Sequence, residues 1–135
     1  MFKKIAVISC VLLAVGCTAP KSSIQANDPK PTYSEMGDKI CTVNPYFVID
    51  NRPQFTDPRS IPLTEHGDHF SVVIGDFFTE SPVLKAYPNR KFLSAYRDAE
   101  NERVFYARER VNGKLVYNVE VIGHGTVGII VYNCK

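Results

Sequence analysis

The residues best suited to chemistry lie in the stretch LTEHGDHF, which places carboxylates and imidazoles within five residues of one another: Glu65, His66, Asp68 and His69. A zinc ion needs three or four such ligands that converge in space, usually with one from elsewhere, and His124 between two glycines is a candidate for that role. The Gly67-Asp68 pair is also typical of a turn that enters a strand, where polar side chains are simply solvated. We therefore predict no bound metal and no other cofactor, and keep three candidate ligands: His66, His69 and Asp68.

A second group of interest is a run of arginines near the C-terminus: Arg97, Arg103, Arg108 and Arg110. In the hairpin register given below, Arg108 and Arg110 lie on the apolar face, opposite Tyr117 and Leu115. Arginine beside an exposed aromatic ring is typical of a recognition surface, so three residues are candidate binding residues: Arg108, Arg110 and Tyr117. The alternative is that these long side chains extend over the rim of the core, with nearby carboxylates neutralising them: Glu100, Glu102 and Glu109.

Recognisable catalytic motifs are absent from the sequence. It contains no G-x-S-x-G, no H-E-x-x-H and no glycine loop of the kind that binds phosphate. A small domain built of strands and long loops also has little room for a deep pocket. We therefore predict that the protein is not an enzyme.

The first residues have the features of an export signal. Residues 1–4 carry two lysines and no acid, and residues 5–16 form an apolar stretch of 12 residues. That stretch is well short of the roughly 20 residues that cross a bilayer as a helix. A basic start, a short apolar middle and small residues at the end indicate a signal peptide over residues 1–16.

The end of this signal, Ala14-Val15-Gly16-Cys17, resembles the lipobox of bacterial lipoproteins, with alanine where leucine is commonest at the first position. The resemblance implies that Cys17 becomes the first mature residue and carries a diacylglyceryl group, with a further chain such as palmitate on its amine. Several acyl chains give durable attachment to a lipid bilayer. Thr18, in place of an aspartate, resembles the default for the outer membrane, which implies an anchor there, on the periplasmic face.

Residues 17–39 predict a flexible tether between this anchor and a folded domain at residues 40–135. The tether is rich in Pro, Ser, Lys and Asp, lacks apolar periodicity, and spans about 25 Å as a random coil. The alternative is a segment that folds on a partner, with Ile24 and Tyr33 as anchors.

Without the two signal lysines, the chain carries 14 basic and 14 acidic residues, a balance that argues against nucleic-acid binding.

The four cysteines predict one disulfide. Cys10 lies in the signal and Cys17 is the lipidation site, which leaves Cys41 and Cys134. In an oxidising compartment this pair is expected to bond and to stabilise the fold by about 4–5 kcal/mol. The first and last strands of the domain must then lie side by side. The alternative is a pair of free thiols or a metal site.

The elements that position these residues are predicted strands. Asn112-Gly113 is a strong hairpin signal, because a type I′ turn needs positive φ at both positions. With Val111 opposite Lys114, one face of the hairpin is apolar, as in a half-buried antiparallel sheet: Val104, Tyr106, Leu115, Tyr117, Val119 and Val121. The Gly-His-Gly sequence around His124 predicts the next turn, and residues 126–134 predict a third, central strand.

Upstream, residues 46–49 and 68–75 predict two further strands. The segment between them, NRPQFTDPRSIPLTEHGD, contains three prolines and predicts a long surface loop. Residues 89–101 fit either a short helix or a strand that turns at AENE, and we favour the strand. The predicted fold is mainly β: a small antiparallel meander, open barrel or sandwich closed by one disulfide, with a short helix near 89–101 as the alternative.

Together these features predict a non-enzymatic protein-binding or inhibitory module on the outer membrane, whose partner is another envelope protein or an incoming one. The plan of lipidated cysteine, β domain and end-to-end disulfide resembles the small lipoprotein inhibitors of lysozyme, and phage- or plasmid-exclusion lipoproteins are similar. The inhibitors' Ser-Gly and Lys-Gly signatures are absent, so no residues are carried over. We expect the binding surface on residues 51–67 and the arginine rim. The alternatives are a structural subunit of an envelope secretion or conjugation complex, and a metal-dependent enzyme.

Overall fold

The computed structural model describes residues 28–135, so the predicted signal peptide, Cys17 and the first part of the predicted tether lie outside the described residues. The described chain contains a short 3-10 helix, η2 (Tyr33–Glu35), and ten strands. In chain order the strands are β1 (Gly37–Ile49), β2 (Arg52–Phe55), β3 (Arg59–Glu65), β4 (Phe70–Ile74), β5 (Phe77–Glu80), β6 (Lys85–Ala86), β7 (Leu93–Ala99), β8 (Glu102–Val111), β9 (Lys114–Ile122) and β10 (Thr126–Tyr132). Within this range, no helix is long and apolar enough to span a bilayer.

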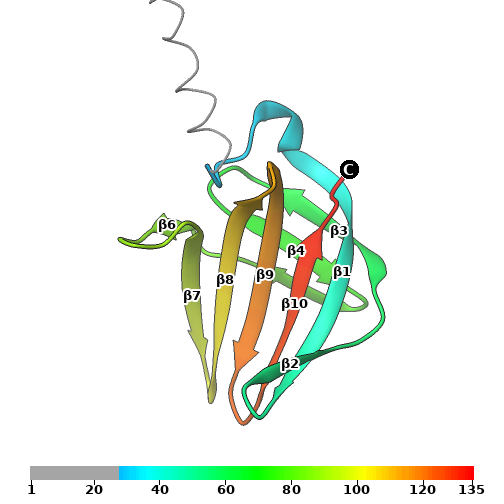
Figure 1. The fold of residues 1–135 in the computed structure, drawn as a ribbon, viewed down its shortest axis with the longest axis vertical. Coiled ribbons are helices and arrows are strands. Elements are labelled where there is room, and N and C mark those ends of the chain that lie inside the picture. The colour runs from blue at the N-terminus through cyan, green and yellow to red at the C-terminus, as the bar shows by residue number, and fades with distance from the viewer. Residues whose placement is uncertain (1–27) are drawn as a thin grey trace, which may run out of the picture.

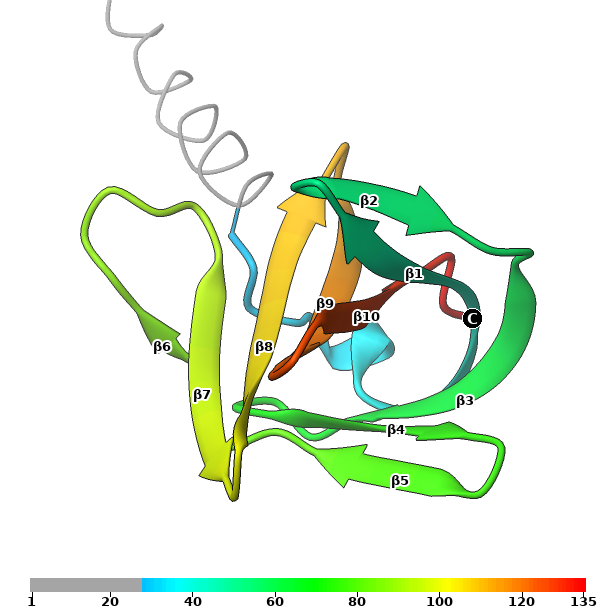
Figure 2. The same cartoon turned by 90° about the horizontal axis from the view of Figure 1, so that it is seen from below.

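All the strands belong to one antiparallel sheet, in the order β5-β4-β3-β1-β10-β9-β8-β7-β6, with β2 paired to β1. The sheet curls into an open half-barrel whose concave side holds the core (Figures 1 and 2). The predicted mainly β fold is confirmed. β7 stands where a helix was the alternative, and it turns into β8 at residues 100–101, as AENE predicts.

The C-terminal hairpin also forms as predicted. Asn112 and Gly113 have φ values of 52° and 81°, and Val111 pairs with Lys114. The predicted apolar face lies in the core, where four of its side chains are buried: Tyr106, Leu115, Tyr117 and Val119. β10 lies between β9 and β1, so the third predicted strand is central.

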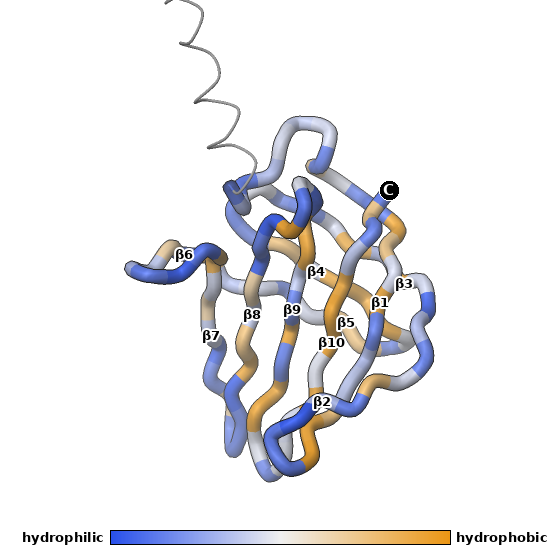
Figure 3. The backbone as a smooth tube through the Cα atoms, viewed as in Figure 1, coloured by the Kyte–Doolittle hydropathy of each residue, from blue (hydrophilic) through white to orange (hydrophobic). Residues whose placement is uncertain are grey.

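The predicted disulfide between Cys41 and Cys134 is confirmed and joins residues 93 positions apart. β1 and β10 lie side by side, pairing from Thr42 with Tyr132 onward, as the bond requires. Figure 3 shows hydrophobic segments along both strands. The core around them is mostly aliphatic and aromatic: Val43, Ile61, Leu63, Phe70, Val72, Val119, Ile129 and Val131.

The predicted surface loop at residues 51–68 is wrong, because this segment contains β2 and β3. β3 buries Ile61, Leu63 and Glu65 at alternate positions, but the carboxylate at the third position conceals the apolar alternation in the sequence. Proline is tolerated because β2 pairs only with β1, and β4 pairs with β3 only from Leu63 onward, after Pro62. Both prolines of these strands therefore have a strand on one side only.

The folded body also begins earlier than the predicted boundary at residue 40. β1 starts at Gly37 rather than at Tyr46, and its first residues already pair with β3. Residues 28–36, which we call the N-terminal strap, lie against one end of the half-barrel (Figure 1). The predicted tether from residue 28 onward therefore belongs to the folded body.

Side chains, rather than backbone pairing, close the gap between β5 and the β7–β8 hairpin, which we call the seam. The Tyr106 and Thr79 hydroxyls lie 2.7 Å apart. Arg97 Nη2 donates to the backbone oxygen of Glu80 at 2.5 Å. These bonds hold the end of β5 in a fixed position.

Candidate functional site

A buried ion pair lies at the strap end of the half-barrel. Arg108 on β8 and Glu65 at the end of β3 face the core, and the exposed fractions of their side chains are 1% and 0%. Arg108 Nη1 donates to Glu65 Oε1 at 2.8 Å, and Tyr117 Oη donates to Glu65 Oε2 at 2.7 Å. The Gly67 N–H also donates to Glu65, at 2.9 Å. These bonds allow the carboxylate to be buried. Burial and the Glu65 charge raise the pKa of Tyr117 far above its usual value.

Further donors of Arg108 and Arg110 hold the strap. They donate to three of its backbone oxygens at 2.6–2.9 Å, those of Asp28, Pro29 and Lys30. Arg110 also binds both oxygens of Glu35 in a fork, at 2.9 and 3.0 Å. Because this bonding favours the charged carboxylate, the pKa of Glu35 falls to about 2.

The predicted binding rim is therefore internal. Arg108 and Tyr117 are buried, Arg110 is nearly so, and their polar groups are engaged by Glu65 and the strap. The sequence places these residues correctly on the apolar face but does not reveal that the strap returns over them. Their contact with a partner remains a prediction, and it requires the strap to leave its place.

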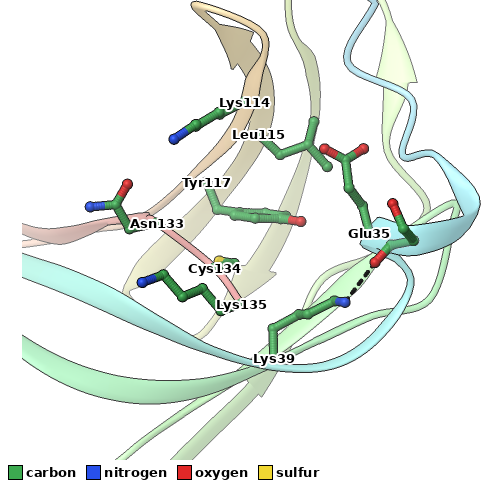
Figure 4. Close-up of a pocket in the computed structure, with 9 residues that line it drawn as sticks. Glu35, Lys39, Lys114, Leu115, Tyr117, Asn133, Cys134 and Lys135 are labelled. Carbon is green, nitrogen blue, oxygen red and sulfur yellow. Dashed lines mark hydrogen bonds between the residues drawn. The ribbon is translucent and has the colours of Figure 1, made fainter.

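Two cavities of different size lie beside the strap. One, of about 240 Å³, is bordered by Glu35, Tyr117 and three lysines, Lys39, Lys114 and Lys135. Figure 4 shows Lys39 bonded to the strap, and its Nζ donates to the backbone oxygen of Ser34 at 2.7 Å. This volume is below the roughly 300–1,000 Å³ of most small-molecule sites. A more open depression of about 550 Å³ lies on the other side of the strap, over Met36, Leu84 and Leu93.

The candidate metal ligands His66 and His69 do come together, in the turn between β3 and β4. Their rings stack with centroids 4.4 Å apart, and both approach the Glu80 carboxylate, which the sequence did not single out. His69 Nε2 lies 2.9 Å from Glu80 Oε2, and His66 Nε2 lies 3.9 Å from it. We call these three side chains the histidine cluster.

The other two candidate ligands have different positions. Asp68 lies beside the cluster, with Oδ1 2.6 Å from His69 Nδ1, so it contacts a histidine rather than the centre of the group. This bond raises the pKa of His69, aided by Glu80 and opposed by burial, and lowers that of Asp68. His124 lies in the β9–β10 turn and is not a member of the group. Glu80 could have been found from Gly75-Asp76, a turn signal between apolar runs that predicts the β4–β5 hairpin.

A third feature is an apolar surface at the opposite end from the strap, next to the loop that the sequence assigns to binding. Three large apolar side chains there lie on one face of the sheet and are 41–52% exposed: Phe47, Ile49 and Val127. Phe47 pairs with Val127 across β1 and β10, whereas Phe55 pairs with Tyr46 and packs on its ring on the opposite face, with centroids 5.5 Å apart. Figure 3 shows hydrophobic colour at this end of the β1–β2 hairpin. We call Phe47, Ile49 and Val127 the hairpin-end patch.

Comparison of this chain with models of protein families, with curated proteins and with solved structures finds no match.

Proposed function

We propose that the protein is a non-enzymatic protein-binding or inhibitory module, held at the outer membrane by the acylated Cys17 that the sequence predicts. The observation that carries this proposal is the hairpin-end patch. Scattered apolar side chains are normal on a protein surface, but a group of aromatic and aliphatic residues on adjoining strands is typical of a surface that binds another protein. The disulfide supports binding, because a rigid scaffold loses less conformational entropy when it binds.

The position of the patch suits a module that is anchored upstream of its domain. The strap and the C-terminus lie at one end of the half-barrel, and the β1–β2 hairpin lies at the other (Figure 1). A lipid anchor before residue 28 would attach at the strap end and present the patch away from the bilayer. Tethering would also raise the concentration of the patch near other envelope proteins.

Site-specific photocross-linking in the native envelope tests this function. We expect benzoylphenylalanine at Phe47, on the same face as Ile49, to capture one envelope or incoming protein. Ile49→Glu should abolish this adduct and leave the fold intact, because Ile49 lies on the exposed hairpin. Tyr33 provides a matched aromatic control, since it is 95% exposed but lies in the strap. The same adduct from both positions, or its persistence in Ile49→Glu, would contradict a role for the patch.

The anchor has its own test. The intact mass of the exported protein should include a diacylglyceryl group at Cys17, and Cys17→Ser should release the protein from the membrane fraction. An exported form without fatty acid would end the proposal of an anchor but would leave the cross-linking result valid.

A structural subunit of an envelope complex is the second candidate, favoured by β5, whose backbone pairs with β4 on one side only within residues 28–135. Its Phe77 and Phe78 are exposed, and an unpaired edge strand can accept a strand from a neighbour. Hydrogen exchange in cells distinguishes the two. A subunit should protect residues 18–27 and the β5 amides that face away from β4, whereas a free module should leave both unprotected.

A further inference from the structure

The histidine cluster carries an inference that is independent of the hairpin-end patch. We propose that His66, His69 and Glu80 form a binding site for one Zn²⁺ ion, with two imidazole nitrogens and one carboxylate oxygen as protein ligands and solvent completing the coordination. Because Ser71 pairs with Glu80 across β4 and β5, the sheet brings Glu80 to the turn that carries both histidines. The site would thus link the β3–β4 turn to the end of β5.

The separations suit such a site. One candidate ligand atom from each side chain lies within 4.8 Å of the others, and the closest pair is 2.9 Å apart. Bond lengths of about 2.0–2.2 Å place tetrahedral zinc ligands about 3.3 Å from one another, so the observed separations bracket the required value. The two imidazoles are nearly parallel, with an interplanar angle of 10°, so one ring must rotate for both nitrogens to face the ion. Their partial exposure, 35% for His66 and 26% for His69, leaves room for that rotation and for water.

The surroundings orient the ligands. Since a carboxylate only accepts, both ring nitrogens of His69 donate in this arrangement, Nδ1 to Asp68 and Nε2 to Glu80, so a metal ion would replace the Nε2 proton and leave the Asp68 bond in place. A carboxylate on the second nitrogen is the usual arrangement of a metal-binding histidine. The His66 N–H closes the turn by donating to the His69 backbone oxygen at 2.9 Å. On the other side, Arg97 fixes the backbone of Glu80 through the seam.

Charge and donor type favour a transition-metal cation. The two carboxylates, Asp68 and Glu80, supply negative charge beside the imidazoles, and the nearby Arg97 donates to a backbone oxygen rather than to the Glu80 carboxylate. Two imidazoles and a carboxylate suit Zn²⁺ or Cu²⁺, whereas Mg²⁺ and Ca²⁺ prefer all-oxygen sites. Zn²⁺ also has no geometric preference of its own, which suits a partly exposed site completed by water.

Titration of the purified full chain with Zn²⁺ alone tests the site, with the disulfide intact and the remaining thiols alkylated so that Cys10 and Cys17 cannot bind metal. Calorimetry should give one Zn²⁺ per chain, and the thermal unfolding midpoint should rise with Zn²⁺. His69→Ala and Glu80→Gln should each weaken binding at least about tenfold, and Asp68→Asn should weaken it about 10- to 100-fold. In NMR spectra, Zn²⁺ should shift the Nε2 resonances of His66 and His69.

Two variants serve as controls. His124→Ala removes the remaining histidine, in a different turn, and Glu100→Gln removes an exposed carboxylate between β7 and β8, so both should bind Zn²⁺ as the wild type does. If His69→Ala fails to fold, Glu80→Gln decides, because the Glu80 side chain is 46% exposed. Wild-type protein that binds no Zn²⁺, or binding that Glu80→Gln and His69→Ala leave unchanged, would overturn the proposal.

Discussion

At the scale of the residue, Arg108 is buried in an apolar core because each of its three side-chain nitrogens donates to an oxygen. The acceptors are the Glu65 carboxylate and two backbone carbonyls, those of Pro29 and Gly67. An ion pair of this kind adds little to stability compared with apolar packing, but the loss of one partner leaves the other charge buried alone. The main consequence of the pair is therefore that a substitution of either residue alone lowers the stability of the fold.

Arg108→Met should be strongly destabilising. It leaves the Glu65 carboxylate in the core without its counter-ion, which typically costs about 3–5 kcal/mol of unfolding free energy. Urea denaturation measures this change. Arg103→Met is the comparison, because the Arg103–Asp98 ion pair is exposed and should matter little. Equal effects of the two substitutions would show that burial does not control the strength of this pair.

The Glu35–Arg110 pair should make strap docking depend on pH. The pKa of Glu35 is about 2 in the folded protein, below its value of about 4.3 in an unfolded chain. Its stabilising contribution is therefore complete above about pH 5 and is lost as pH falls toward 2. Glu35→Gln should lower the unfolding free energy by about 2–3 kcal/mol at pH 7, and this difference from wild type should disappear near pH 2. A difference that stays constant with pH would contradict the assignment.

The sequence predicts part of this site because register is a local property. Once Val111 faces Lys114, Arg108 must lie opposite Tyr117 on the inner face. The partner carboxylate Glu65 is 43 positions from Arg108, and the strap acceptor Pro29 is 79 positions away. No periodicity links residues so distant, so only the folded chain reveals that the arginines are internal.

At the scale of the element, strands delimited by clear turn residues could be predicted, and those that contain proline or an inward carboxylate could not. The turn at Asn112-Gly113 predicts β8 and β9, and it predicts which side chains of each strand face the core. β3 has the same alternation, but with Pro62 and the buried Glu65 within it. Within residues 89–101 the sequence fits both a strand and a helix, and the pairing of β7 with β8 supplies the long-range contacts that stabilise the strand.

Gly128 illustrates how tightly two strands can pack. A Cβ at this position would lie 2.5 Å from ring atoms of Tyr46, whose hydroxyl donates to Glu120 and accepts from Asn118. Gly128→Ala should therefore displace the ring and cost about 1–3 kcal/mol of stability. Gly125→Ala, where the added Cβ meets nothing within 4 Å, should be nearly neutral.

A double-mutant cycle by urea denaturation checks this explanation. In a Tyr46→Ala background, the cost of Gly128→Ala should disappear, because the clashing ring is gone. An equal cost in both backgrounds would show that the β10 backbone, rather than the Tyr46 ring, causes the loss of stability.

At the scale of the whole molecule, the Cys41–Cys134 bond closes almost the entire described chain into one loop. Replacing both cysteines with alanine should preserve the β1–β10 pairing but lower the unfolding free energy by about 4–5 kcal/mol, mainly because the unfolded chain gains freedom. The unfolding free energies of the oxidised and the dithiothreitol-treated wild type, measured by urea denaturation, should differ by a similar amount. Equal free energies would mean that the bond adds no stability beyond the strand pairing.

The chain enters and leaves the half-barrel at the same pole, since Lys135 exchanges two backbone hydrogen bonds with Ile40 at the start of β1. A fluorescent reporter or affinity tag fused after Lys135 would sit beside the strap and leave the far pole unobstructed (Figure 1). The same reporter inserted between Asp50 and Asn51, at the tip of the β1–β2 hairpin, would mask that pole. Comparing the two fusions therefore tests which end of the half-barrel is required for function in cells.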